Sequence, residues 1–271
     1  MTGLATPSAV DVSDNRVRPV PFFSQVASFD ELWPDISRQV TDVFDRGSYS
    51  NGPKVAELEA AMCARTGARH AVGVSNGTDA LVVLLRACGI GAGDEVVVPA
   101  FTFAASATSV ALAGARPVFA DIEPDTYALD PASVAAAIGE RTRAVMPVHL
   151  FCQMADMGVL TELADERGLL LVEDSAEAIG MWWDGVHAGL LGAGGVLSFF
   201  PTKTLGAFGD AGMVLTNDDE VARTARALRN HGRPSAGAGA VPGVADLAAW
   251  GLAPDLAALA GVATPATVAG G

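Results

Sequence analysis

Short apolar runs alternate along the chain with longer stretches in which apolar positions recur every three to four residues. The short runs predict seven strands, at residues 71–75, 95–99, 117–121, 143–148, 169–173, 195–199 and 212–216. Several of these runs are apolar at every position, as is typical of parallel strands that helices cover on both faces. The longer stretches predict helices at residues 78–88, 103–113, 131–138, 156–167 and 218–230. This alternation predicts an α/β fold with a mostly parallel sheet flanked by helices in three layers.

The two ends of the chain differ from this central pattern. Residues 30–45 and 54–66 predict two helices joined by a turn-rich segment, and after residue 233 the chain is dominated by Ala, Gly and Pro, with Asp246 and Asp255 as its only charges. We therefore expect one large domain at residues 1–233, which includes the N-terminal helical segment. Residues 234–271 are expected to form a low-complexity, disordered tail, with one short helix near residues 245–249.

Charge and composition exclude several classes of function. The chain has 17 Lys and Arg against 31 Asp and Glu, a formal charge of -14, and this acidic balance opposes binding to nucleic acid. No stretch offers the roughly 18 uncharged apolar residues that a membrane helix needs. The N-terminal residues lack the pattern of a secretory signal, and the three cysteines are odd in number without CxxC spacing. These features favour a cytoplasmic protein.

Lysine is rare, since only Lys54 and Lys203 occur among the basic residues. Because an arginine cannot replace the amine of a lysine as a nucleophile, a lysine retained in an arginine-rich chain draws attention. Lys203 follows the strand predicted at 195–199 and has Phe199, Phe200 and Phe208 close to it in the sequence. Apolar surroundings lower the pKa of a lysine and leave the free amine that Schiff-base chemistry requires. The alternative is a surface lysine in a loop.

The segment at residues 75–81, SNGTDAL, closes a strand and opens a helix. The first turn of a helix exposes unpaired N–H groups and a partial positive charge, so Gly77 can admit a phosphate and Thr78 can add a hydroxyl. An ordinary capped turn, with Asn76 or Thr78 as the cap, is the alternative. The sequence has no GxGxxG after a strand and no GxxxxGK[ST], which removes the main support for dinucleotide-dependent oxidoreductases and P-loop proteins.

Two acids, Glu173 and Asp174, end a run of large aliphatic residues. A carboxylate at the mouth of a buried strand is costly unless it has a partner such as a protonated ring nitrogen, and Asp174 is the better candidate. The alternative is that Asp174 caps the next turn. A phosphate cup, a carboxylate and an amine at three strand ends are the parts that a pyridoxal 5'-phosphate enzyme requires.

Residues 20 to about 234 resemble the DegT/StrS-type sugar aminotransferases, which have the fold type I of pyridoxal phosphate enzymes. The resemblance rests on seven segments in family order: SNGTDAL (75–81), VPAFTF (98–103), DIEPDTY (121–127), PVHL (147–150), EDSAEA (173–178), SFFPTK (198–203) and LRNHG (228–232). It implies the large domain of this fold, with the small C-terminal domain of the family missing.

The resemblance assigns residues to the phosphate and to the two faces of the cofactor ring. Gly77, Thr78 and Ser198 are implied to bind the phosphate. Phe103 is implied to stack on one face of the ring, and Ala176 to pack against the other face.

Three further residues carry the chemistry by the same resemblance. Asp174 is implied to pair with the ring nitrogen, Glu177 to lie near the ring hydroxyl, and Lys203 to be the Schiff-base lysine. Related dehydratases carry histidine at that last position, so the lysine favours transamination.

The resemblance also implies substrates and assembly. We expect amination of a keto group on a nucleotide-linked sugar or aminocyclitol precursor, with glutamate as the donor and a homodimer as the assembly. The alternative is a non-catalytic relic that acts as a structural or regulatory partner of an intact homologue.

Two other features have simpler interpretations. His149 is expected to be a hydrogen-bonded structural histidine. Trp182 and Trp183 are expected in a partly exposed hairpin that covers the site or contacts a second subunit.

Overall fold

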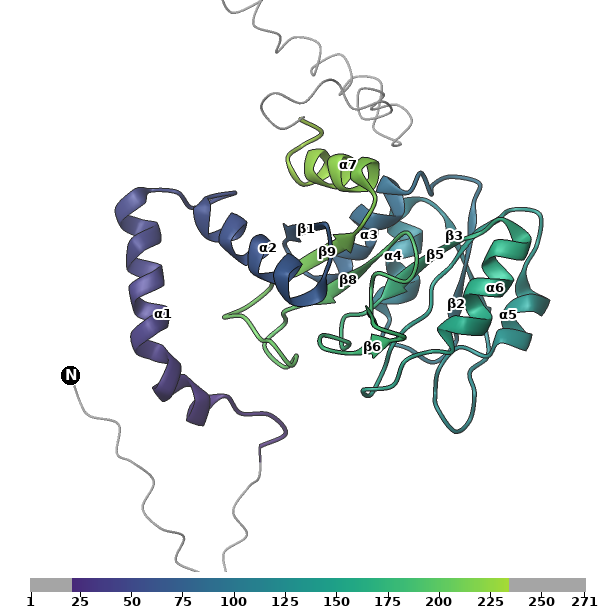
Figure 1. The fold of residues 1–271 in the computed structure, drawn as a ribbon, viewed down its shortest axis with the longest axis horizontal. Helices are drawn as coiled ribbons and strands as arrows, with labels where there is room; N and C mark the ends of the chain where they lie inside the picture. Colours follow the sequence, from purple (N-terminus) through teal and green to yellow (C-terminus); the bar gives the residue numbers. More distant parts are fainter. Residues whose placement is uncertain (1–20, 234–271) are drawn as a thin grey trace, which may run out of the picture. The chain divides into compact units, whose positions relative to one another are not determined.

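The computed structural model describes residues 21–233, apart from the side chains of residues 27 and 28. Its contacts divide the chain into two compact units, residues 1–49 and 50–271. In the first unit, α1 (Val26–Arg46) is a single helix that ends at Gly47, whose left-handed φ of 62° stops the helix (Figure 1). The helix predicted at residues 30–45 is confirmed and begins four residues earlier.

The second unit is built on a seven-stranded sheet with the order β1-β9-β8-β5-β4-β2-β3. Its strands are β1 (His70–Val74), β2 (Glu95–Pro99), β3 (Arg116–Ala120), β4 (Thr142–Val145), β5 (Leu170–Asp174), β8 (Gly194–Ser198) and β9 (Gly212–Thr216). Only β9 runs antiparallel to its neighbours, β1 and β8. The mostly parallel sheet is confirmed, and each strand begins within one residue of its predicted start.

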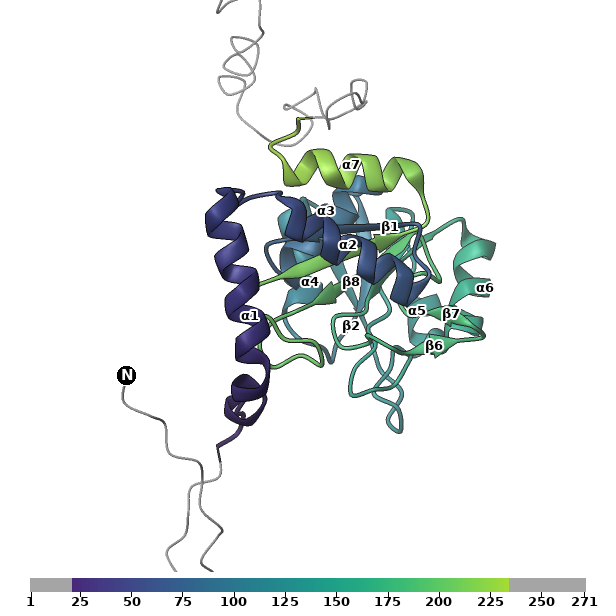
Figure 2. The ribbon, with the colours of Figure 1, turned by 60° about the vertical axis from the view of Figure 1, so that its left-hand side comes forward.

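Helices cover both faces of this sheet (Figures 1 and 2). Along β2, Val96 and Val98 pack with Val110 in one buried cluster, whereas Val97 between them packs with Leu160 in another. This alternation shows that the two faces of the sheet contact different helices. One face carries α2 (Pro53–Thr66), α5 (Pro131–Ala137) and α6 (Met157–Arg167), and the other carries α3 (Gly77–Ala87), α4 (Ala105–Ala113) and α7 (Asp219–Arg229). The predicted three-layer α/β fold is confirmed.

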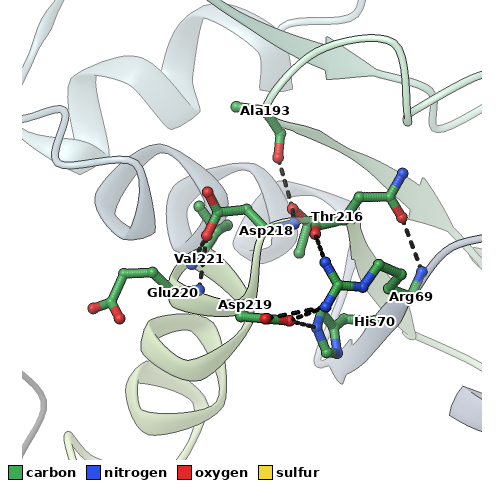
Figure 3. A network of polar contacts seen from close by, with 9 residues as sticks. Arg69, His70, Ala193, Thr216, Asp218, Asp219, Glu220 and Val221 are labelled. Carbon is green, nitrogen blue, oxygen red and sulfur yellow. Dashed lines mark hydrogen bonds and ion pairs between the residues drawn. The ribbon is translucent and has the colours of Figure 1, made fainter.

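A polar network fastens the start of β1 to the start of α7 (Figure 3). The backbone N–H of Arg69 donates to Asn217 Oδ1 at 2.9 Å, and its guanidinium donates to Asp219 at 2.9 and 3.0 Å. Asp219 also meets His70 Nε2 at 2.6 Å, and the hydrogen bond from His70, together with Arg69, lowers the pKa of Asp219. Asp218 caps α7 by accepting the N–H of Val221. The network thus joins the residues that open β1 to those that open α7.

A short hairpin follows β5. Its strands are β6 (Trp182–Trp183) and β7 (Val186–His187), so the tryptophans do lie in a hairpin. That this hairpin covers the site or contacts a second subunit stays a prediction. Within the described part of the chain, no helix combines the length and apolar character needed to cross a membrane. The predicted tail at 234–271 and the helix near 245–249 lie outside the described residues. The domain boundary at residue 233 stays a prediction.

Candidate active site

Three candidate segments lie at one edge of the sheet. Strands β1, β5 and β8 point the same way, because β1 and β8 are both antiparallel to β9 and β5 is parallel to β8. The loops after these strands carry Asn76, Glu177 and Lys203 respectively. The carboxyl edge of an α/β sheet is where such proteins bind ligands, so the topology brings the predicted site residues to one place.

The segment predicted to bind phosphate, at the start of α3, packs closely against the end of β8. Gly77 and Ser198 touch, since a Cβ on Gly77 would lie 2.9 Å from the Ser198 Cβ and 3.2 Å from its Oγ. The Ser198 hydroxyl therefore lies against the first turn of α3, beside the half-buried Thr78. Asn76 caps the helix by accepting the N–H of Asp79 at 2.8 Å. The capped-turn interpretation is thus confirmed, and it coexists with a cup made of the first N–H groups and a hydroxyl.

Gly212, the first residue of β9, determines how closely this loop approaches the sheet. A Cβ there would lie 2.3 Å from the carbonyl carbon and oxygen of Asn76 and 2.7 Å from the nitrogen of Gly77. Real Cβ atoms do not approach backbone atoms so closely, so the cup requires glycine at this position. The sequence motifs give Gly212 no role of its own; the only sign of it in the sequence is the glycine-rich segment after Lys203.

Asp174 ends β5 and is almost fully buried, with 5% of its surface exposed. Its Oδ2 accepts a hydrogen bond from Ser106 Oγ at 2.7 Å, and its Oδ1 accepts one from Ala176 N–H at 3.3 Å. Burial raises the pKa of the Asp174 carboxyl, although the Ser106 and Ala176 hydrogen bonds and the charge of Lys203 oppose that rise. A buried carboxylate in this state gains from a cationic partner.

The segment between β2 and α4 supplies Phe103 and Ser106. Phe103 is 73% exposed, and its stacking on a ligand stays a prediction. Helix α4 begins two residues later than predicted and places Ser106 in full burial against Asp174. Ser106 was not singled out from the sequence, because a serine in a helix of small residues gives no sign of its tertiary partner.

Lys203 lies on the loop after β8. Its Nζ donates to Glu177 Oε1 at 2.7 Å, and its side chain is 21% exposed. The positive charge of Lys203 is one of the influences that oppose the rise in the pKa of Asp174. The expected apolar enclosure is wrong in part: Phe200 and Phe208 are exposed, and the nearest polar partner of the amine is a carboxylate. The surroundings of a side chain on a loop are determined by its tertiary contacts, and not by how apolar its neighbours in the sequence are.

His149 has the structural role that the sequence predicts. The buried ring accepts the N–H of Ala155 at Nδ1, so its Nε2 carries the proton that is donated to Glu173 Oε2 at 3.1 Å. The Glu173 carboxylate, also fully buried, accepts further backbone N–H groups from Gly189, Leu191 and Gly192. Glu173 is thereby satisfied within the protein, which leaves Asp174 as the acid available to a ligand.

Comparison with known proteins identifies the family. The model of the DegT/DnrJ/EryC1/StrS aminotransferase family matches residues 31–245. The chain belongs to this family. The resemblance carried by the seven segments is therefore confirmed, and the fold is that of the pyridoxal phosphate aminotransferases.

Individual relatives agree with this assignment. A pleiotropic regulatory protein of Geobacillus stearothermophilus is 47% identical over 213 residues, which are 79% of this chain and 57% of the relative. A UDP-N-acetyl-3-dehydro-alpha-D-glucosamine 3-aminotransferase of Acidithiobacillus ferrooxidans is 45% identical over 213 residues, 79% of this chain and 58% of the relative. The crystal structure of DesV from S. venezuelae, in complex with a ketimine intermediate, superposes with a TM-score of 0.77 at 44% identity, covering 81% of this chain and 59% of DesV. The chain spans less than three fifths of the length of these curated relatives.

The residues present fit the cofactor of this family, pyridoxal 5'-phosphate. The Gly77–Ser198 contact makes a small cup at a helix N-terminus, Asp174 is a buried carboxylate without a cationic hydrogen-bond partner of its own, and Lys203 offers an amine nearby. Among residues 21–233, no group of three or more His, Cys, Asp or Glu side chains could hold a metal ion.

Proposed function

We propose that this chain carries the cofactor-binding half of an aminotransferase site that converts a keto group of a nucleotide-linked sugar, or of an aminocyclitol precursor, into an amine. The observation that supports this most is the convergence of Lys203, Asp174 and the Gly77–Ser198 cup at one edge of the sheet. Family membership and a relative named as a UDP-sugar aminotransferase support the substrate class.

Each residue has a task in this proposal. When bound, pyridoxal phosphate supplies an aldehyde and a ring that accepts electrons. The N–H groups of Gly77 and Thr78 and the hydroxyl of Ser198 hold the phosphate. Asp174 keeps a proton on the ring nitrogen by stabilising its positive charge. Phe103 and Ala176 confine the ring between them.

Lys203 performs the covalent and proton-transfer steps. Its amine would hold the cofactor through the aldehyde, and once free it would accept and return a proton as a general base and acid. The ion pair with Glu177 restrains the position of the amine on the loop after β8. We propose glutamate as the donor, on the resemblance to similar enzymes.

Assembly and location are parts of the same proposal. Three aromatic residues on loops at the carboxyl edge, Phe101, Tyr127 and Phe151, have ring centroids 5.8 to 6.4 Å apart, and about half of each residue's surface is exposed. Such a cluster supports an apolar contact with a second subunit, as a homodimer requires. Free thiols at all three cysteines support the cytoplasm as the location.

The decisive experiment uses the chain's scarcity of lysine. After incubation with pyridoxal phosphate and reduction with borohydride, peptide mapping should place the added mass on Lys203. Lys203→Arg keeps a cation for Glu177 but lacks a nucleophilic amine, so it should take up no label. Lys54→Arg, at the other lysine of the chain, is the matched control and should label as the wild type does.

Turnover is tested separately with glutamate and a nucleotide-linked keto sugar, by following formation of the keto acid. A folded protein that gains no mass at Lys203 contradicts the proposal and favours the non-catalytic alternative. Label on Lys203 without turnover supports the cofactor site and contradicts the proposed reaction under those substrates.

A further inference from the structure

A buried hydroxyl lies behind the proposed ring-nitrogen partner. Ser106, in α4, is fully buried, and its Oγ donates to Asp174 Oδ2 at 2.7 Å. The second contact to the carboxylate is weaker, since the Ala176 N–H reaches Oδ1 at 3.3 Å. Of the two hydrogen bonds that orient the Asp174 carboxylate, the one donated by the Ser106 hydroxyl is therefore the shorter.

The direction of the hydrogen bonds follows from the number of protons. A serine hydroxyl has one proton, and in Ser106 that proton points to the carboxylate. The contact of 3.0 Å between Thr102 Oγ1 and Ser106 Oγ is then one in which Thr102 donates. Two hydroxyls in series thus direct their positive ends toward Asp174, and such a chain strengthens its last bond.

We propose that Ser106 is a positioning residue for Asp174: it fixes the plane of the carboxylate and favours its ionised form, so that the carboxylate can pair with a protonated ring nitrogen. This inference rests on the proposed cofactor site. Hydrogen bonds to an ionised carboxylate favour the charged state and are stronger than neutral ones.

Other groups influence Asp174 without orienting it. Lys203 acts on it through its charge and is engaged with Glu177, whereas His149 is engaged with Glu173. Burial alone works against ionisation. Removal of the Ser106 hydroxyl leaves the carboxylate with only the longer bond from Ala176, free to rotate and easier to protonate.

A graded series at one position tests this. Ser106→Ala removes the donor, and Ser106→Cys keeps a side chain of similar shape with a weaker donor. The matched control is Ser109→Ala: Ser109 is equally buried on α4, but its hydroxyl donates to the backbone carbonyl of Ser106 at 3.1 Å.

Two readouts apply to each folded variant of the full chain. The first is the infrared carboxyl band of Asp174 in the cofactor-free protein, isolated by subtraction of the Asp174→Asn spectrum and followed with pH. The second is the dissociation constant for pyridoxal phosphate. Ser106→Ala should move the titration of Asp174 to higher pH and weaken cofactor binding about tenfold, the effect of losing one hydrogen bond to a charged group. Ser106→Cys should fall between Ala and the wild type, and Ser109→Ala should match the wild type.

The inference is overturned if Ser106→Ala leaves the Asp174 titration unchanged, or if Ser109→Ala shifts it equally. Should Ser106→Ala fail to fold, Thr102→Val removes the outer hydroxyl at a partly buried site, and it should shift the titration in the same direction by less. A wild-type chain that binds no cofactor refutes the proposed function, whereas the infrared titration still decides whether Ser106 controls the ionisation of Asp174.

Discussion

Asp174 lies at a position where burial disfavours its ionised form. Its charge therefore lowers the stability of the cofactor-free protein, which suits a residue whose role is to bind a ligand. Its folded-state pKa is raised above the ordinary value of 3.8. Above pH 3.8 the folded state therefore holds more protons than the unfolded state, and the free energy of unfolding falls as the pH rises through the folded-state value. Asp174→Asn has no carboxyl to ionise, so we expect it to stabilise the cofactor-free protein relative to wild type, increasingly toward neutral pH.

The same substitution should weaken pyridoxal phosphate binding about tenfold or more, because the amide supplies no negative charge to the ring nitrogen. Urea unfolding at acid and neutral pH and a cofactor titration measure the two effects. Asp125→Asn, which removes an exposed carboxylate far along the chain from β5, is the matched control and should change neither quantity appreciably. A destabilised cofactor-free Asp174→Asn protein contradicts this account.

Among the elements, the β6–β7 hairpin depends on a neutral histidine. His187 accepts the Gly180 N–H at Nε2, 3.0 Å away, and donates from Nδ1 to the carbonyl of Ala188. Burial lowers the pKa of His187 from its ordinary 6.5. Below that value the unfolded chain takes up a proton that the folded hairpin resists, so stability falls with decreasing pH, by at most about 1.4 kcal/mol per pH unit from this group.

Hydrogen exchange localises this effect. Between about pH 7 and about pH 5, the Gly180 amide should lose protection relative to Met181, whose N–H donates to the carbonyl of Ala178 at 3.0 Å. His187→Gln can keep an acceptor but does not titrate, and it should abolish the pH dependence of this ratio. A ratio that stays constant in the wild type shows that the hairpin does not depend on the neutral ring.

The contact between β9 and the start of α3 is a second element whose geometry can be tested. Gly212→Ala places a methyl group 2.3 Å from backbone atoms of Asn76, which cannot move without opening the phosphate cup. We expect a loss of about 2 kcal/mol in the free energy of unfolding, together with weaker binding of inorganic phosphate and of pyridoxal phosphate. Gly91→Ala, where the nearest atom would be 3.8 Å away, is the control and should be tolerated.

At the scale of the whole molecule, the sequence predicted the architecture better than the side-chain contacts. Strands such as β2, Glu95–Pro99, were predicted because burial on both faces requires a continuous apolar run, which is visible in the sequence. Asp174 and Lys203 were predicted because each is a charged residue at or just after the end of an apolar strand. Ser106 and Gly212 were missed as parts of the site, because their importance comes from residues 68 and 136 positions away, Asp174 and Asn76. The reversed direction of β9 likewise depends on pairing, which an apolar run does not specify.

Hydrogen bonds between residues far apart in the sequence also stabilise the second unit. Glu59 of α2 accepts hydrogen bonds from the Gly73 N–H of β1, at 2.8 Å, and from the Arg229 guanidinium of α7, which also donates to the Gly73 carbonyl at 3.0 Å. The Glu59 and Arg229 side chains are only 17% and 19% exposed, so their charges depend on each other more than those of a surface pair.

Glu59→Gln should therefore lower the free energy of unfolding by about 2 kcal/mol, since it leaves a mostly buried guanidinium without its counter-charge. Glu57→Gln, on the same helix, breaks the exposed pair with Lys54 and should cost less than about 0.5 kcal/mol. In a double-mutant cycle, Arg229→Gln should cost much less in the Glu59→Gln background than in the wild type. Additive losses would show that the two side chains stabilise α2 and α7 independently.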